Sequence, residues 1–299
     1  MAEHHSTPLG MAPSPGIFLS AVAQRTRRLR FGTLVYLLPL YHPIRLAEEI
    51  AMLDQLSDGR LDVGVGRGIS PIESTLYGRD PATSQAAYDE ALTIIRAALK
   101  DRVVNFDGQH YSFHDVTLEI GPVQTPYPPL WYGISSPASA ERCVREGFNV
   151  VSLAKASAVA EVAAAFKLAA HASGCTDLRC GLGRFVVVAD TDAAAMAIAR
   201  PAYARWYENF HYLYHKQGRS PVQGERPTDF DGAIAADLGI AGSPQTVRDF
   251  LAAEIRQTGV NYFMGQFVFG DMPQDAALRS IELFAAEVRP QLQQLPALT

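Results

Sequence analysis

The chain has 299 residues, of which 48% are hydrophobic and 19% are charged, and its formal net charge is -5. A chain of this length can bury a large core, and this composition excludes an intrinsically disordered protein. Its 26 basic residues form no long cluster and are outnumbered by 31 acidic residues, which argues against nucleic acid as a partner.

From residue 29 onward, short β-rich runs alternate with longer helical patterns. We expect six strands, over residues 29–38, 61–65, 130–132, 150–153, 185–189 and 260–267. We expect helices over residues 46–56, 88–99, from about 138, 158–172, 192–210 and 275–292, with an additional helix opening at Ser243-Pro244. This rhythm runs without a linker, so the sequence predicts one α/β domain over residues 1–299.

Two segments depart from the rhythm. Asp107-Gly108, between the β-rich runs 104–106 and 110–113, predicts a tight hairpin. Residues 211–236 have little periodicity and mix glycine, proline and charge, which predicts a long mobile loop of the kind that often closes over a site. Successive βα units form either an open doubly wound sheet or a closed (β/α)8 barrel, and both bind ligands at the C-terminal ends of the strands.

Cysteine usage and hydropathy favour the cytoplasm. Three cysteines without paired metal-ligand spacing predict neither a disulfide framework nor a metal site. No apolar run reaches the ~18 residues of a membrane span. The N-terminal residues 1–5 lack the basic and apolar regions of a signal peptide, so we expect no membrane association.

A glycine-rich loop follows the predicted strand 61–65. Gly64-Val65-Gly66-Arg67-Gly68 reads G-x-G-x-G and not the G-x-G-x-x-G of dinucleotide-binding folds. It is either a tight turn with a surface arginine, or a place where the backbone approaches a ligand and Arg67 offers a forked donor to phosphate.

Serines follow the predicted strand 130–132. Ser135, Ser136 and Ser139 surround Pro137 at the start of a predicted helix. Hydroxyl groups at a helix N-terminus form an anion site, but a serine before proline is also an ordinary N-cap. The pattern supports both interpretations.

Two adjacent histidines lie near the N-terminus. On a strand, the rings of His4 and His5 would point to opposite faces, so the pair is unsuited to binding one metal ion. One ring could serve in acid–base chemistry, or the pair could be solvated and inert. Glu73 follows Arg67 by six residues, which allows a surface ion pair between them.

The order and spacing of these motifs resemble those of one enzyme family. Similarity to the bacterial luciferase-like flavin monooxygenases extends over nearly the whole chain and is carried by Glu3-His4-His5, Pro39-Leu40-Tyr41-His42-Pro43, Leu53 to Arg60, Gly64 to Gly68, Ser136, Ser139 and Gly242-Ser243-Pro244. The resemblance implies a (β/α)8 barrel in which the six predicted strands are strands three to eight.

The resemblance also implies roles for particular residues. The flavin phosphate would be bound by Arg67, Ser135, Ser136 and Ser139. His4 would be the catalytic histidine, with Glu73 as an acidic catalytic group near the flavin. Leu34-Val35 would form a non-prolyl cis peptide beside the isoalloxazine.

The implied reaction has two components. A separate reductase supplies reduced FMN, which reacts with oxygen at C4a to give a (hydro)peroxide that oxygenates a small organic substrate. Two alternatives are an F420-dependent dehydrogenase or reductase on the same barrel, and a flavin-binding paralogue without catalysis. Family habit implies a homo-oligomer. Gly66 stands where bacterial luciferase has a reactive cysteine, so we predict no light emission.

The resemblance bears on the N-terminus as well. Relatives place a strand, a helix and a second strand before the Glu-His-His motif, and such a unit needs about 30 residues. Only Met1 and Ala2 precede the motif here. We therefore expect a barrel that lacks strands one and two, with Met1 an internal methionine at the end of strand two. The alternative is a shortened protein that pairs its open edges with another chain.

Overall fold

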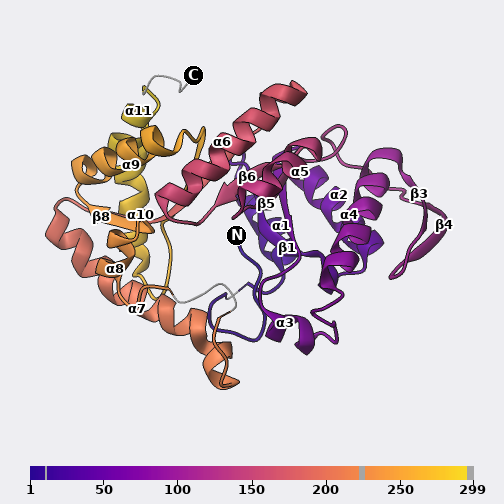
Figure 1. Cartoon of the computed structure of the whole chain (residues 1–299), viewed down its shortest axis with the longest axis horizontal. Helices are drawn as coiled ribbons and strands as arrows, with labels where there is room; N and C mark the ends of the chain where they lie inside the picture. The colour runs from indigo at the N-terminus through magenta and orange to yellow at the C-terminus, as the bar shows by residue number, and fades with distance from the viewer. Residues whose placement is uncertain (11, 222–225, 295–299) are drawn as a thin grey trace. The chain divides into compact units, whose positions relative to one another are not determined.

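The computed structural model describes residues 1–10, 12–221 and 226–294 (Figure 1). Backbone contacts group these residues into two compact units. The first unit begins at Met1 and extends to Tyr132, and most of the second lies between Gly133 and Ser220 and beyond residue 225. Each unit has its own set of packed elements, and the single domain expected from the sequence stays a prediction.

The first unit contains a parallel sheet in the order β1-β2-β5. Its elements are α1 (Pro15–Arg25), β1 (Phe31–Leu37), η1 (Leu38–Leu40), α2 (Pro43–Ser57), β2 (Leu61–Gly66), α3 (Pro71–Leu76), α4 (Ser84–Asp101), the antiparallel pair β3 (Val103–Asp107) and β4 (Ser112–Thr117), and β5 (Leu130–Gly133).

The second unit is built around β7, in which all nine residues are buried. Strands β6, β8 and β9 each pair with β7 in parallel. Its elements are η2 (Pro137–Ser139), α5 (Ala140–Arg145), β6 (Asn149–Ser152), α6 (Ala156–Ser173), β7 (Cys180–Val188), α7 (Asp192–Lys216), α8 (Phe230–Ala235), β8 (Gly239–Gly242), α9 (Pro244–Thr258), β9 (Tyr262–Gln266), α10 (Gln274–Leu283), the π-helical η3 (Phe284–Val288) and α11 (Arg289–Leu292).

Helix α2 illustrates how the sequence produces these elements. Proline in its first turn suits a helix start because the missing N–H has no helical partner there. Leu46, Ile50 and Leu53 recur at helical spacing and are at most 3% exposed. Asp58 takes the left-handed conformation that ends the helix. The apolar stripe therefore fixes which face of α2 is buried.

Within the described part of the chain, seven strands lie in parallel pairs, so the prediction of six is wrong by one strand. The additional strand is β8 (Gly239–Gly242), which is only four residues long and contains two glycines, a weak strand signal. Helix α1 was not predicted from the sequence, and in it Ile17 and Phe18 are exposed while Leu19 is buried. These pairings establish a mostly parallel α/β fold, and closure into a complete barrel stays a prediction.

The segment 211–236 is more regular than the sequence suggests. Helix α7 continues to Lys216, and α8 occupies Phe230–Ala235. Asp229 caps α8 by accepting a hydrogen bond from the Gly232 N–H at 2.7 Å. Residues 222–225 lie outside the described residues. The loop is therefore shorter than predicted, and its mobility stays a prediction.

Glu90 on α4 holds the β3–β4 hairpin, which is seen beside α4 in Figure 1. Its carboxylate accepts hydrogen bonds from the backbone N–H groups of Gln109, His110 and Tyr111 at 2.7, 2.9 and 3.1 Å. A side chain at Gly108 would crowd this carboxylate, which explains the glycine in the predicted turn. Desolvation raises the pKa of Glu90, but the three backbone donors outweigh it and leave the pKa lowered.

We expect acid to loosen this hairpin. Because the pKa of Glu90 is lowered in the folded state, its stabilisation is complete above the unfolded value of about 4.3 and is lost as pH falls through the folded value. Amide hydrogen exchange at Gln109, His110 and Tyr111 checks this. Glu90→Gln should speed exchange at neutral pH, whereas Asp89→Asn on the same helix should not; equal rates in both variants would contradict the prediction.

No helix within the described ranges is long and apolar enough to cross a membrane.

Candidate functional site

The N-terminal segment lies along β1 in the first unit. The Leu34 N–H donates to the Met1 carbonyl at 2.7 Å, and the Leu37 N–H donates to Glu3 Oε2 at 2.9 Å. Glu3 is 2% exposed. These bonds hold the residues just before the two histidines against β1 and place them near its C-terminal end.

Glu73 contacts both histidines. It lies in the first turn of α3, where Ser70 Oγ accepts a hydrogen bond from its N–H. Its Oε1 accepts the His5 N–H at 2.6 Å, and its Oε2 lies 3.5 Å from His4 Nδ1. Two of the alternatives that the sequence left open are thereby excluded. Glu73 is buried against the histidines and is not a surface partner of Arg67, and His5, at 8% exposure, is not a solvated residue.

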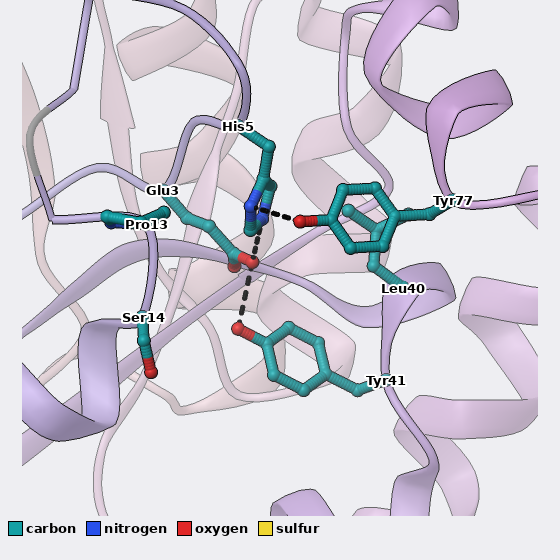
Figure 2. A pocket seen from close by; sticks show the side chains of 7 residues that line it. All are labelled: Glu3, His5, Pro13, Ser14, Leu40, Tyr41 and Tyr77. Atoms are coloured by element: carbon teal, nitrogen blue, oxygen red, sulfur yellow. Dashed lines mark hydrogen bonds and ion pairs between the residues drawn. The ribbon is translucent and has the colours of Figure 1, made fainter.

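A chain of side-chain hydrogen bonds continues from His5 (Figure 2). Glu3 Oε1 accepts from the Tyr41 hydroxyl at 2.8 Å and lies 2.7 Å from His5 Nε2. His5 Nδ1 lies 2.8 Å from the Tyr77 hydroxyl. A carboxylate can only accept, so the bond to Glu3 assigns a proton to Nε2 of His5.

This chain borders a pocket of about 340 Å³, shown in Figure 2, which is lined by Glu3, His5, Pro13, Ser14, Leu40, Tyr41 and Tyr77. The sequence analysis assigned no role to Glu3, Tyr41 or Tyr77. Tyr77 is 72 residues from His5, so no local spacing could have connected them.

Burial keeps the nearby phenols protonated. Burial, reinforced by the charge of Glu3, raises the pKa of Tyr41 far above its usual value. Burial also raises the pKa of Tyr36, whose hydroxyl donates to Glu49 at 3.2 Å. The pKa of Glu49 itself is raised by burial, against the opposing effect of the Tyr36 hydrogen bond. Tyr41 therefore stays a hydrogen-bond donor to Glu3.

The glycines of β2 allow β1 to approach closely. The Leu34-Val35 peptide bond is cis, as the resemblance implies. A side chain at Gly64 would overlap the Thr33 carbonyl, and one at Gly66 would lie 2.6 Å from Val35 Cγ2. Gly64 and Gly66 are therefore needed for the close packing of β2 against β1, a reason that neither interpretation of the glycine-rich loop included. Arg67, the residue after β2, is exposed, and no described residue accepts a hydrogen bond from its guanidinium.

The three serines lie in the second unit. Ser136 Oγ accepts a hydrogen bond from the Ala138 N–H at 3.3 Å, so it caps η2 as the N-cap interpretation predicts. Ser135 is exposed, and Ser139 is half-buried at the start of α5. The structure thus brings His4 and Glu73 together, whereas Arg67 and the serines belong to different units and their joint phosphate site stays a prediction.

Comparison with known proteins identifies the family of this chain. The family model for luciferase-like monooxygenases matches residues 1–262. An uncharacterised Sinorhizobium fredii protein, y4wF, is 40% identical over 293 residues, which are 96% of this chain and 85% of that protein. The crystal structure of the monooxygenase RslO1 from Streptomyces bottropensis is similar with a TM-score of 0.86 and 28% identity, covering 97% of this chain and 87% of that one.

A more distant structure shares the fold. The oxygenating constituent of 3,6-diketocamphane monooxygenase from Pseudomonas putida, solved in complex with FMN, is similar with a TM-score of 0.80 and 23% identity. The match covers 97% of this chain and 87% of that one. The family model spans most of the 299 residues, and the y4wF similarity covers nearly all of them. The chain therefore belongs to the luciferase-like monooxygenases and is an oxidoreductase.

Proposed function

We propose that this protein is the oxygenase of a two-component system that uses reduced FMN and oxygen to oxygenate a small organic substrate. The observation that carries the proposal is the buried Glu73 carboxylate beside His4, in the same unit as the cis Leu34-Val35 peptide of β1. Membership of the family supports it, as does the relative described as an oxygenating constituent bound to FMN. A flavin reductase would then be the partner that supplies the reduced cofactor.

The residues present fit a flavin by their chemistry. Arg67 is an exposed fork of N–H donors without an acceptor among the described residues, which suits a phosphate. Ser135 and Ser139 would add hydroxyl donors, and Leu34 and Val35 would face the isoalloxazine. When bound, the flavin supplies the activation of oxygen, chemistry that no amino-acid side chain provides.

His4 is suited to hold a proton near the reacting atoms. Its Nδ1 faces Glu73, and its side chain is 21% exposed, so Nε2 is the nitrogen left to meet a ligand. Glu73 orients the ring through Nδ1 and, by accepting the His5 N–H, fixes the backbone that carries it. In this proposal His4 is the catalytic residue, and Glu73, predicted as a second catalytic residue, acts through His4 as a positioning residue.

Spectroscopic titration with FMN, reduced FMN and F420, followed by an oxygen-consumption assay, tests the function. We expect reduced FMN to bind and oxygen to be consumed. Tighter binding of F420 with oxygen-independent turnover would favour the hydride-transfer alternative. Flavin binding without oxygen consumption in the presence of any substrate would favour the non-catalytic alternative.

Arg67→Ala should weaken FMN binding by about 1.5–3 kcal/mol, the contribution of a charged hydrogen bond, which is roughly 10- to 150-fold in Kd. Quenching of FMN fluorescence measures this. Arg28→Ala, which removes another exposed arginine of the first unit, is the matched control. An unchanged Kd in folded Arg67→Ala protein removes Arg67 from the phosphate site.

A further inference from the structure

The pocket beside the N-terminal segment contains a second acid–base arrangement that the proposed role of His4 does not use. Tyr77 is 49% exposed, His5 is 8% exposed and Glu3 is 2% exposed. Their polar atoms are joined in that order by contacts of 2.8 and 2.7 Å. Exposure thus decreases from the phenol, through the imidazole, to the carboxylate.

The three groups have the roles of a hydrogen-bonded triad. Glu3 accepts from His5 Nε2, which leaves Nδ1 of the neutral ring as a lone pair facing the Tyr77 hydroxyl. Glu3 is itself held by the Tyr41 hydroxyl and the Leu37 N–H. The carboxylate is therefore fixed, and Tyr77 is the most exposed residue of the triad.

Helix α3 explains why this triad lies next to the His4–Glu73 pair. Tyr77 follows Glu73 by four residues, one helical turn, and its backbone N–H donates to the Glu73 carbonyl. Glu73 thus binds the backbone of His5 while Tyr77 contacts its ring, with centroids 4.7 Å apart. Glu73 and Tyr77, four residues apart, therefore contact two adjacent histidines: Glu73 contacts the ring of His4, and Tyr77 contacts the ring of His5.

We propose that Tyr77, His5 and Glu3 form a proton relay that ionises a neutral phenol bound in the 340 Å³ pocket. The ligand hydroxyl gives its proton to Tyr77 Oη as Tyr77 passes its own proton to His5 Nδ1. The products are a ligand phenolate, a neutral Tyr77 that donates to it, and an imidazolium whose charge Glu3 compensates. No electron is transferred and no other bond breaks.

The chemistry of the pocket selects a phenol. The proton that the phenol releases ends on His5, and the Glu3 carboxylate, 2.7 Å from Nε2, stabilises the resulting imidazolium. A phenol, which ionises near pH 10 as tyrosine does, can supply this proton far more readily than an aliphatic alcohol, which is a much weaker acid. A carboxylic acid is already ionised at neutral pH, so the negative charge of Glu3 would repel it. Glu49, which interacts electrostatically with Glu3, adds a second acidic group nearby. Pro13 and Leu40 supply apolar walls, and the volume is in the range of small-ligand pockets.

Ionisation makes an aromatic ring more electron-rich and hence easier to oxygenate. That the phenol is the oxygenation substrate rests on the proposed function. The relay itself needs no flavin. An experiment can therefore contradict the relay without contradicting the proposed oxygenase function, and the reverse.

Absorbance spectroscopy with para-nitrophenol tests the relay without flavin, because the neutral and anionic forms of this probe absorb at different wavelengths. The titration is run well below the pH at which the free probe ionises. We expect the bound probe to show the anion spectrum with the wild-type protein. Tyr77→Phe keeps the ring and removes the hydroxyl, so the anion signal should fall at least tenfold while the Kd changes only a few-fold.

Two further variants and one probe complete the experiment. His5→Gln should also lose the anion signal, and Tyr127→Phe, a tyrosine of the first unit outside the pocket, should keep it. Para-nitroanisole, which has no hydroxyl proton, should show no spectral change. Nitrogen-15 NMR of the wild-type imidazoles should show that His5 carries its proton on Nε2. The His5 signal is assigned as the one that is missing from the spectrum of His5→Gln.

Three results would overturn the proposal. They are failure of the wild type to bind the probe, binding of the neutral form alone, and an undiminished anion signal in Tyr77→Phe. Because Tyr77→Phe removes one partly exposed hydroxyl, the proposal does not depend on whether His5→Gln folds.

Discussion

Replacing His4 with alanine is expected to leave the affinity for reduced FMN unchanged and to speed the return of bound, oxygen-exposed flavin to its oxidised form by roughly 100-fold or more, the typical contribution of a positioned acid–base group. The reason is the position of the ring. Its Nδ1 faces buried Glu73. In the proposed site its other nitrogen would hold a proton beside the flavin. Without the imidazole, water supplies and removes protons, and hydrogen peroxide is released sooner.

Stopped-flow absorbance after mixing the reduced complex with oxygen measures this rate, and a peroxide assay measures the product. His114→Ala is the control, because His114 is an exposed histidine of the β3–β4 hairpin. Glu73→Gln should act in the same direction but more weakly, since the amide oxygen can still accept the His5 N–H. Equal reoxidation rates for wild type and His4→Ala would exclude His4 from the oxygen chemistry.

Replacing Glu254 with alanine is expected to cost about 3–5 kcal/mol of unfolding free energy, the penalty for leaving a buried charge unpaired. Arg184 on β7 is 0% exposed, and its Nε and Nη2 donate to the Glu254 carboxylate at 2.8–3.0 Å. Burial raises the pKa of Glu254, against the opposing effect of Arg184. Arg184 Nη1 donates to the Ala154 and Gly183 carbonyls, but neither carbonyl balances its charge.

Urea denaturation measures the loss, and Glu282→Ala, which removes an exposed glutamate of α10, is the control. The double variant Arg184→Met with Glu254→Met should be less destabilised than the sum of the two single replacements, because a buried ion pair contributes little compared with an apolar pair. Additive losses would contradict the view that the penalty comes from the orphaned charge.

Local patterns were sufficient to predict several parts of this protein. The alternation of β-rich runs with helical patterns predicts the α/β class, and Asp107-Gly108 predicts the hairpin that β3 and β4 form. Ser136 before proline predicts the cap that it makes with the Ala138 N–H. In each case the interacting groups are close in sequence, so their geometry follows from backbone preferences and spacing.

The order of the motifs predicted the family, and with it the cis Leu34-Val35 bond. Local spacing misled where the partner was distant. Glu73 is six residues from Arg67, yet it binds His4 and His5, nearly 70 residues away, because α3 returns beside the N-terminal segment.

The sequence by itself determined the fold class, most helices and strands, and the family. Only the tertiary structure decided that Gly64 and Gly66 make room for β1, that β7 is the strand to which β6, β8 and β9 pair, and that Tyr77 reaches His5. The physical reason is range. Propensities and caps act over about one turn of helix or strand, whereas burial and hydrogen bonding between distant segments depend on which surfaces the completed fold brings together.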